Sequence, residues 1–102
     1  MLWLCPMKPS EALGRHRDAI RWIVEAHRAR NARVFGSALR GDDTEQSDLD
    51  LLVDTTSETT LFDMGWIQAE LRQLLGVRVD VLTPDELPEK FRAQVLAQAR
   101  PL

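Results

Sequence analysis

Two different periods in the hydrophobic positions divide the chain into helices and strands. Apolar residues recur every three to four positions over residues 10–29 and 64–75, which predicts two amphipathic helices. Gly76 follows the second helix and fits a helix C-cap. A third helical pattern begins after Pro88 and is expected to end at Pro101. The chain therefore contains three main helical segments.

Apolar residues at every second position mark the strands. This pattern covers residues 48–54 and 77–82, and a shorter apolar run covers residues 32–35. A turn after the central strand places Thr55 and Glu58 at capping-box spacing, which predicts the entry to the second helix. A helix between two strands is the connection expected of neighbours in a mixed or parallel sheet. We therefore expect an α+β fold, with a small mixed β-sheet of about three strands covered by helices.

Length and charge limit the possible functions. The 102 residues form one domain of ordinary size, 1–102, in which residues 1–9 are expected to lie loosely on the surface. A net charge of −3 argues against a general nucleic-acid-binding surface. The apolar N-terminal stretch is too short to span a membrane and makes a poor signal peptide. With a single cysteine as well, the sequence favours a cytoplasmic location without membrane association.

Two aspartates at the start of the central strand carry the first chemical signal. Asp48 and Asp50 are two positions apart in a strand, so their carboxylates project from one face, roughly 7 Å apart along the backbone. Such carboxylates repel each other unless a cation lies between them, and hard divalent cations such as Mg²⁺ prefer oxygen ligands. Considered alone, the two aspartates would more often form a polar turn with solvated side chains at the strand entrance.

A Gly-Ser pair upstream favours the chemical interpretation. Gly36 and Ser37 follow the short strand, and ten residues separate them from Asp48. A strand that runs into Gly-Ser and then a short helix presents backbone N–H groups and a hydroxyl, which suit phosphate oxygens. Metal-binding carboxylates beside a phosphate site indicate phosphoryl or nucleotidyl transfer.

This combination resembles a known family. Gly-Ser, ten residues and then Asp-x-Asp is similar to the signature of the DNA polymerase beta-like nucleotidyltransferase superfamily, and the compact surroundings resemble its minimal nucleotidyltransferases. The resemblance implies transfer of AMP from ATP to a hydroxyl with two Mg²⁺ ions, which Asp48 and Asp50 would hold. Gly36 and Ser37 would hold the β- and γ-phosphates.

A third carboxylate is expected from the same resemblance. In the superfamily it comes from a later strand beside the Asp-x-Asp strand, and Asp80 is the acid in residues 77–82 that fits. Asp80 would complete a metal site or take the proton of the attacking hydroxyl. Considered without the resemblance, Asp80 would be interpreted as an edge-strand charge.

One departure from the family pattern affects the phosphate site. The minimal nucleotidyltransferases often read G-S-R-A-R-G, whereas this chain reads G-S-A-L-R-G, so Ala38 replaces the first arginine. Arg40 and Gly41 match the pattern. Arg40 is therefore a candidate for adding positive charge to the nucleotide-binding site, while the loss of the first arginine could weaken that site.

The partner and the acceptor are also implied by resemblance. Minimal nucleotidyltransferases are commonly antitoxins of HEPN ribonuclease toxins, and the acceptor is then a tyrosine hydroxyl of the toxin. Two alternatives remain at this stage. The chain could neutralise a toxin by binding alone, with a catalytically silent site, or it could be a stand-alone transferase that acts on a small molecule or RNA.

The remaining charged residues are expected to have structural roles. Arg30 and Arg33 are interpreted as part of a solvated basic helix end, which Asn31 would close. Asp43 lies in a polar loop and is expected to be solvated. Asp54 is interpreted as a residue at the end of the central strand.

Overall fold

A mixed four-stranded sheet forms the centre of the molecule. The computed structural model describes residues 7–102, so the N-terminal expectations for residues 1–6 lie outside the described residues. The strand order is β3-β2-β1-β4, with β1 over Ala29–Phe35, β2 over Leu49–Thr55, β3 over Val79–Leu82 and β4 over Arg100–Pro101. β2 pairs with β1 antiparallel and with β3 parallel. The predicted α+β class is confirmed, and β4 is an edge strand that the sequence pattern did not reveal.

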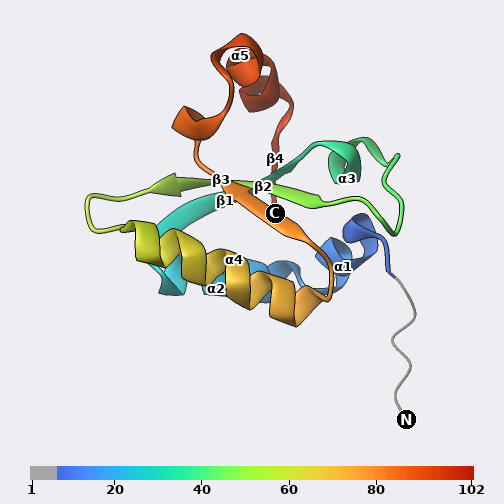
Figure 1. The fold of residues 1–102 in the computed structure, drawn as a ribbon, viewed down its shortest axis with the longest axis horizontal. Coiled ribbons are helices and arrows are strands. Elements are labelled where there is room, and N and C mark those ends of the chain that lie inside the picture. The colour runs from blue at the N-terminus through green and yellow to red at the C-terminus, as the bar shows by residue number, and fades with distance from the viewer. Residues whose placement is uncertain (1–6) are drawn as a thin grey trace.

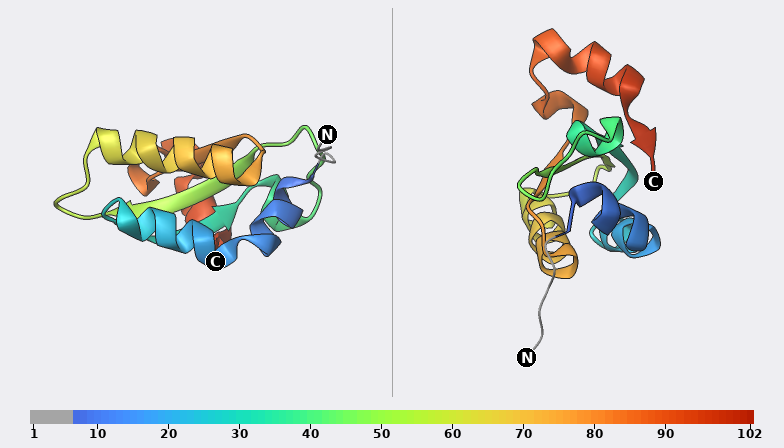
Figure 2. Two further views of the ribbon diagram at one scale, coloured as in Figure 1. Left: turned by 90° about the horizontal axis from the view of Figure 1, so that it is seen from below. Right: turned by 90° about the vertical axis from the view of Figure 1, so that its right-hand side faces the viewer.

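Helices cover the two faces of the sheet unequally (Figure 1). One face is covered by α1 (Pro9–Arg15), α2 (Arg17–Ala26) and α4 (Leu61–Leu75), and the other carries the short 3-10 helix η1 (Pro84–Glu86) and α5 (Glu89–Gln98). The four-residue helix α3 (Ser37–Arg40) follows β1 at the end of the sheet. Figure 2 shows α2 and α4 side by side beneath the sheet and α5 on the opposite side.

Strand alternation explains how β2 serves both faces. Leu49, Leu51 and Val53 are fully buried in the main core. Leu52 is fully buried too, but it lies outside that core, on the face where Leu87 follows η1. Asp50 shares this second face with Leu52. β2 therefore has a hydrophobic middle on both faces and an acidic start on one.

The prediction of one helix over residues 10–29 is wrong in one respect, because this segment contains two helices. His16 has φ −128° and ψ 26°, and this break separates α1 from α2. α1 is oriented by a contact far along the chain: Ser10 N donates to Asp43 Oδ2 at 2.8 Å, and Ser10 Oγ donates to Asp43 Oδ1 at 3.0 Å. Asp43 is only 5% exposed, so its expected role as a solvated loop charge is wrong. Met7 and Pro9 also pack, although residues 1–9 were expected to lie loosely.

The basic segment after α2 belongs to a strand and not to a helix end. Helix α2 ends at Ala26, and Asn31 has φ 57° within β1, where the pairing register with β2 shifts. This bulge brings both Asn31 and Arg33 onto Asp54, at 2.8 Å from Asn31 Nδ2 to Oδ2 and 2.5 Å from Arg33 Nη2 to Oδ1. Asp54 thus lies near the end of β2, as predicted, but it is paired by β1.

Helix α4 begins five residues later than its predicted cap. Thr60 is the N-cap: Thr60 Oγ1 accepts from Asp63 N at 3.1 Å, and Asp63 Oδ2 accepts from Thr60 N at 2.9 Å. This hydrogen bond from the Thr60 backbone lowers the pKa of Asp63. Gly76, with φ 70°, ends the helix as predicted. Within residues 7–102, no helix is long and apolar enough to cross a membrane.

Candidate active site

Gly36 and Asp50 meet at the junction of β1, α3 and β2. Gly36 has φ 77° and ψ −152°, a conformation that is essentially restricted to glycine. A Cβ atom at Gly36 would lie 2.4 Å from Asp50 Oδ2. Gly36, which was expected to bind phosphate, therefore has a second role. Its lack of a side chain leaves room for the carboxylate of Asp50, which lies against its backbone.

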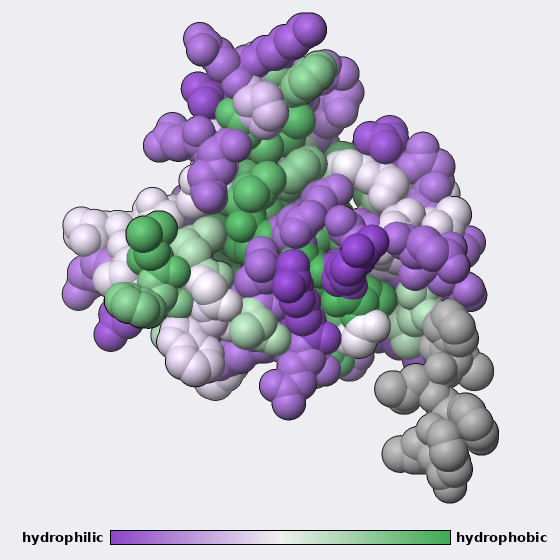
Figure 3. All heavy atoms as spheres, in the orientation of Figure 1, coloured by the Kyte–Doolittle hydropathy of each residue, from purple (hydrophilic) through white to green (hydrophobic). Residues whose placement is uncertain are grey.

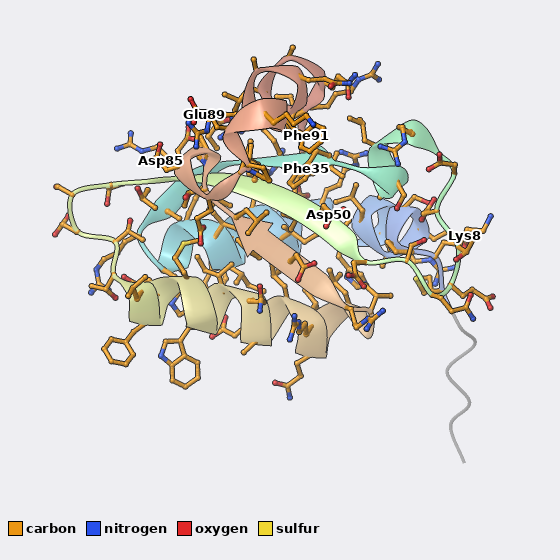
Figure 4. All side chains as sticks on the ribbon, turned by 45° about the horizontal axis from the view of Figure 1, so that its top comes forward. Lys8, Phe35, Asp50, Asp85, Glu89 and Phe91 are labelled. Carbon is orange, nitrogen blue, oxygen red and sulfur yellow. The ribbon has the colours of Figure 1, made fainter. Side chains whose placement is uncertain are left out.

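Asp80 lies beside Asp50 in the sheet. The two residues are register partners in the parallel β2–β3 pair, whose strands lie about 4.8 Å apart. Phe35 is the partner of Asp50 on the β1 side. Figure 4 shows Asp50 and Phe35 on the face of the sheet that carries Phe91 of α5. Residues from β2 and β3 therefore place two of the three predicted carboxylates on one face.

The electrostatic state of Asp50 reflects this crowding. Its pKa is raised from 3.8 to about 6, first because burial disfavours the charge, and then because Asp80 and Asp48 repel it. The positive charge of Arg40 acts in the opposite direction and lowers the pKa. A carboxylate in this state gains from any cation that can lie among the three acids.

Asp48 and Asp80 each contact an arginine. Asp48 directly precedes β2, and its Oδ1 lies 2.9 Å from Arg78 Nε without hydrogen-bond alignment, so this buried oxygen has no hydrogen-bond partner. Asp80 Oδ1 lies 3.7 Å from Arg72 Nη2. Neither arginine was predicted to belong to the site. The alternation of residues 77–82 did place Arg78 on the face of Asp80, but Arg72 is in α4 and only the packing of α4 on β3 brings it near.

The donor set fits divalent metal ions. Carboxylate oxygens are the ligands that Mg²⁺ prefers, and the unpartnered, buried Oδ1 of Asp48 is available to a cation. Within residues 7–102, however, three acidic, histidine or cysteine side chains do not already converge into a ready-made metal site. Asp48, Asp50 and Asp80 could hold metal ions after local rearrangement of side chains, most simply by moving away from the arginines.

The predicted phosphate-binding residues lie next to these acids. Ser37 is the first residue of α3, and Gly36 O accepts from the N–H groups of Leu39 and Arg40, both at 3.1 Å. Arg40 is exposed and contacts Asp42 at 3.3 Å. It also borders a hollow of about 500 Å³ between α3 and the end of α5, together with Arg100. The structure thus brings Gly36, Ser37 and Arg40 to the same end of the sheet as the carboxylates.

A separate hollow lies away from these residues. It measures about 650 Å³ and lies between the end of β2, η1 and the start of α4, and none of the six predicted site residues lines it. The predicted site lies at the other end of β2. We place the candidate active site by its chemistry, because a carboxyl with a raised pKa, Asp50, beside a glycine turn is more informative than the size of a hollow.

Comparisons with known proteins agree with this geometry. The family model described as "Nucleotidyltransferase domain" matches residues 13–102. A candidate protein adenylyltransferase of Methanocaldococcus jannaschii, MJ0435, is 34% identical, and the match covers 76% of this chain and 83% of that protein. The protein adenylyltransferase MntA of Thermococcus cleftensis is also 34% identical, and the match covers 79% of this chain and 90% of that protein.

Two solved structures share the fold. One is described as a candidate minimal nucleotidyltransferase, with a TM-score of 0.82, 43% identity and coverage of 91% of this chain and 95% of the other. The second is a toxin–antitoxin structure with AMP-PNP, with a TM-score of 0.69, 19% identity and coverage of 82% and 69%, and at this identity it supports the fold alone. The chain belongs to the nucleotidyltransferase domain family. Within that family it is a minimal nucleotidyltransferase.

Proposed function

We propose that this nucleotidyltransferase transfers AMP from ATP to a tyrosine hydroxyl of a HEPN ribonuclease toxin and thereby acts as its antitoxin. The observation that carries the proposal is the grouping of Asp48, Asp50 and Asp80 beside the Gly36 turn. Two relatives described as protein adenylyltransferases, one of them a candidate, support AMP as the transferred group and a protein as the acceptor. A toxin as the partner is what the resemblance to antitoxins of the minimal nucleotidyltransferase type implies, and the toxin–antitoxin structure shares the fold of this chain.

The proposed reaction forms one bond to phosphorus and breaks another. The oxygen of the acceptor hydroxyl attacks the α-phosphorus of ATP, and the bond from that phosphorus to the oxygen shared with the β-phosphate breaks. Pyrophosphate leaves with the bonding electron pair. The hydroxyl proton passes to a carboxylate, for which Asp80 is the candidate, since it lies beside Asp50 on the edge strand β3.

Each predicted residue has a distinct part in this reaction. Gly36 and Ser37 would bind the β- and γ-phosphates, and Arg40 would add positive charge to the same region. Asp48, Asp50 and Asp80 would hold two Mg²⁺ ions, whose charge neutralises the triphosphate and the developing charge of the leaving group. Because Ala38 replaces an arginine of the family pattern, Arg40 is the arginine of that pattern that remains.

Intact-protein mass spectrometry tests the proposal directly. The chain is incubated with the toxin encoded beside it, Mg²⁺ and ATP, and in parallel as the Asp48→Ala, Asp50→Ala double variant. We expect the toxin to gain the mass of one or more AMP groups with the wild-type chain only. Peptide mapping then identifies the modified residue, which we expect to be a tyrosine.

Two outcomes would lead to other functions. A stable complex that silences the toxin without a mass change, and equally with the double variant, would establish an antitoxin that acts by binding. Modification of a small molecule or RNA, with an unmodified toxin, would establish a stand-alone transferase.

A further inference from the structure

The guanidinium of Arg78 forms an ion pair with Asp48, one of the three acids of the candidate site. Arg78 Nε lies 2.9 Å from Asp48 Oδ1, and the arginine side chain is otherwise 75% exposed. The backbone of Arg78 is fixed, because its carbonyl accepts from Leu49 N at 2.8 Å. The chain thus holds Arg78 at the entrance of β2 by its backbone, while its guanidinium remains free to leave the carboxylate.

Arg72 is held differently, although it also lies near an acid of the site. Its Nε donates to the carbonyl of Val79 at 3.0 Å, which fixes the guanidinium to the backbone of β3. From there Nη2 lies 3.7 Å from Asp80 Oδ1, beyond hydrogen-bond length. Arg72 therefore stays in place without Asp80, whereas the position of the Arg78 guanidinium depends on Asp48.

The place that Arg78 occupies is one that a metal ion needs. Asp48 Oδ1 is buried and has no hydrogen-bond partner, and the positive charge nearest to it is the guanidinium of Arg78. A divalent cation that binds Oδ1 would meet this charge at close range, so the two cations exclude each other.

We propose that Arg78 is a tethered counter-cation of the metal-free site, which neutralises Asp48 and which a divalent cation must displace. The inference rests on the proposed function, since it assumes that Asp48 and Asp50 bind metal. Arg78 is a regulatory residue in this role and takes no part in the bond changes. It keeps the acids partly neutralised until a metal ion, alone or with its nucleotide, binds.

The expected effect is moderate, because Arg78 is mostly exposed. A solvent-exposed ion pair contributes at most about 1 kcal/mol, so removal of the competing charge should tighten metal binding by about two- to fivefold. Arg78→Lys keeps the charge but loses the planar group and should lie between Arg78→Gln and the wild type.

Titration with Mn²⁺ followed by electron paramagnetic resonance of the free ion measures this affinity without any catalysis. The experiment compares the wild type with Arg78→Gln, Arg78→Lys and Arg30→Gln, each with and without AMP-PNP. Arg30→Gln is the matched control, because Arg30 is an exposed arginine at the opposite end of the sheet, paired in register with Asp54. Asp50→Asn is added to locate the bound ion.

The inference and the proposed function fail in distinguishable ways. We expect tighter Mn²⁺ binding in Arg78→Gln, less than a twofold change in Arg30→Gln, and strongly weakened binding in Asp50→Asn. Equal or weaker binding in Arg78→Gln, with Asp50→Asn still defective, overturns the role of Arg78 alone. Binding that does not depend on Asp50, or no binding in any variant, overturns both the metal site and the inference.

Discussion

Substitution of Gly36 by alanine tests the closest approach in the site. The added methyl group would lie 2.4 Å from Asp50 Oδ2, 3.3 Å from Asp50 Cγ and 3.4 Å from Asp50 Cβ. The backbone conformation, φ 77° and ψ −152°, is a second obstacle for any residue with a Cβ. The two obstacles are physically separate, so they can be measured separately.

The expected cost is the sum of these two contributions. A non-glycine residue in such a conformation costs about 1–3 kcal/mol. An overpacked contact that forces a neighbour to move costs about 1–3 kcal/mol more. We therefore expect Gly36→Ala to lower the free energy of unfolding by about 4 kcal/mol, a large part of the stability of a domain of this size.

Urea unfolding followed by circular dichroism measures both contributions through a double-mutant cycle. In the Asp50→Ala background the carboxylate is absent and only an ordinary contact with Cβ remains, so Gly36→Ala should cost about 1–3 kcal/mol less there. Gly65→Ala is the control, since Gly65 lies in α4 with nothing within 4 Å of the added Cβ. It should stabilise the chain by about 0.5–1 kcal/mol.

The reasoning would be refuted by either of two results. An equal cost of Gly36→Ala in both backgrounds would show that Asp50 does not require the glycine. A cost near zero would show that the backbone at position 36 is not restricted to glycine in solution.

Further predictions concern the acids and a buried hydrogen bond. The pKa of Asp50 rises from 3.8 to about 6, which means that the fold prefers the neutral carboxyl. The rise corresponds to a change in the free energy of unfolding of at most about 3 kcal/mol, and of about 1 kcal/mol after screening of this half-buried group. The favourable contribution of the neutral Asp50 carboxyl is complete below pH 4 and is lost as the pH rises through 6. Asp50→Asn should therefore stabilise the chain at pH 7.5 and not at pH 4, as measured by urea unfolding. An equal gain in stability at both pH values would contradict this. Saturating Mg²⁺ should raise the melting temperature of the wild type at pH 7.5 and leave that of Asp50→Asn unchanged, as measured by differential scanning fluorimetry with EDTA controls. Asp43→Ala should lower the free energy of unfolding by about 2 kcal/mol, because two donors of Ser10 lose their acceptor. The control is Asp42→Ala, at the exposed neighbouring residue, which should change the free energy of unfolding by less than about 0.5 kcal/mol. Similar losses in both variants would argue against the buried contact.

Local patterns in the sequence were sufficient for the outline of the fold and for naming a candidate site. Strand alternation depends only on the backbone, and the alternation predicted over residues 77–82 is confirmed: Val79 and Val81 lie in the core and Asp80 lies on the other face. The parallel neighbours β2 and β3 followed from the helix between them. The spacing of Gly36, Ser37, Asp48 and Asp50 was enough to suggest nucleotidyl transfer, and the comparisons establish the family.

Contacts between distant segments were decided by the tertiary structure alone. The contact of Ser10 with Asp43 and the bulge at Asn31 each join segments far apart in sequence. The break at His16 is a local change of backbone angles that the helical period did not reveal. Periodicity reports which way a side chain faces, but it does not report what lies there, because that depends on strand register and on how the layers pack. For the same physical reason the sequence predicted Gly36 and Asp50 as site residues, whereas only the folded chain shows that one requires the other.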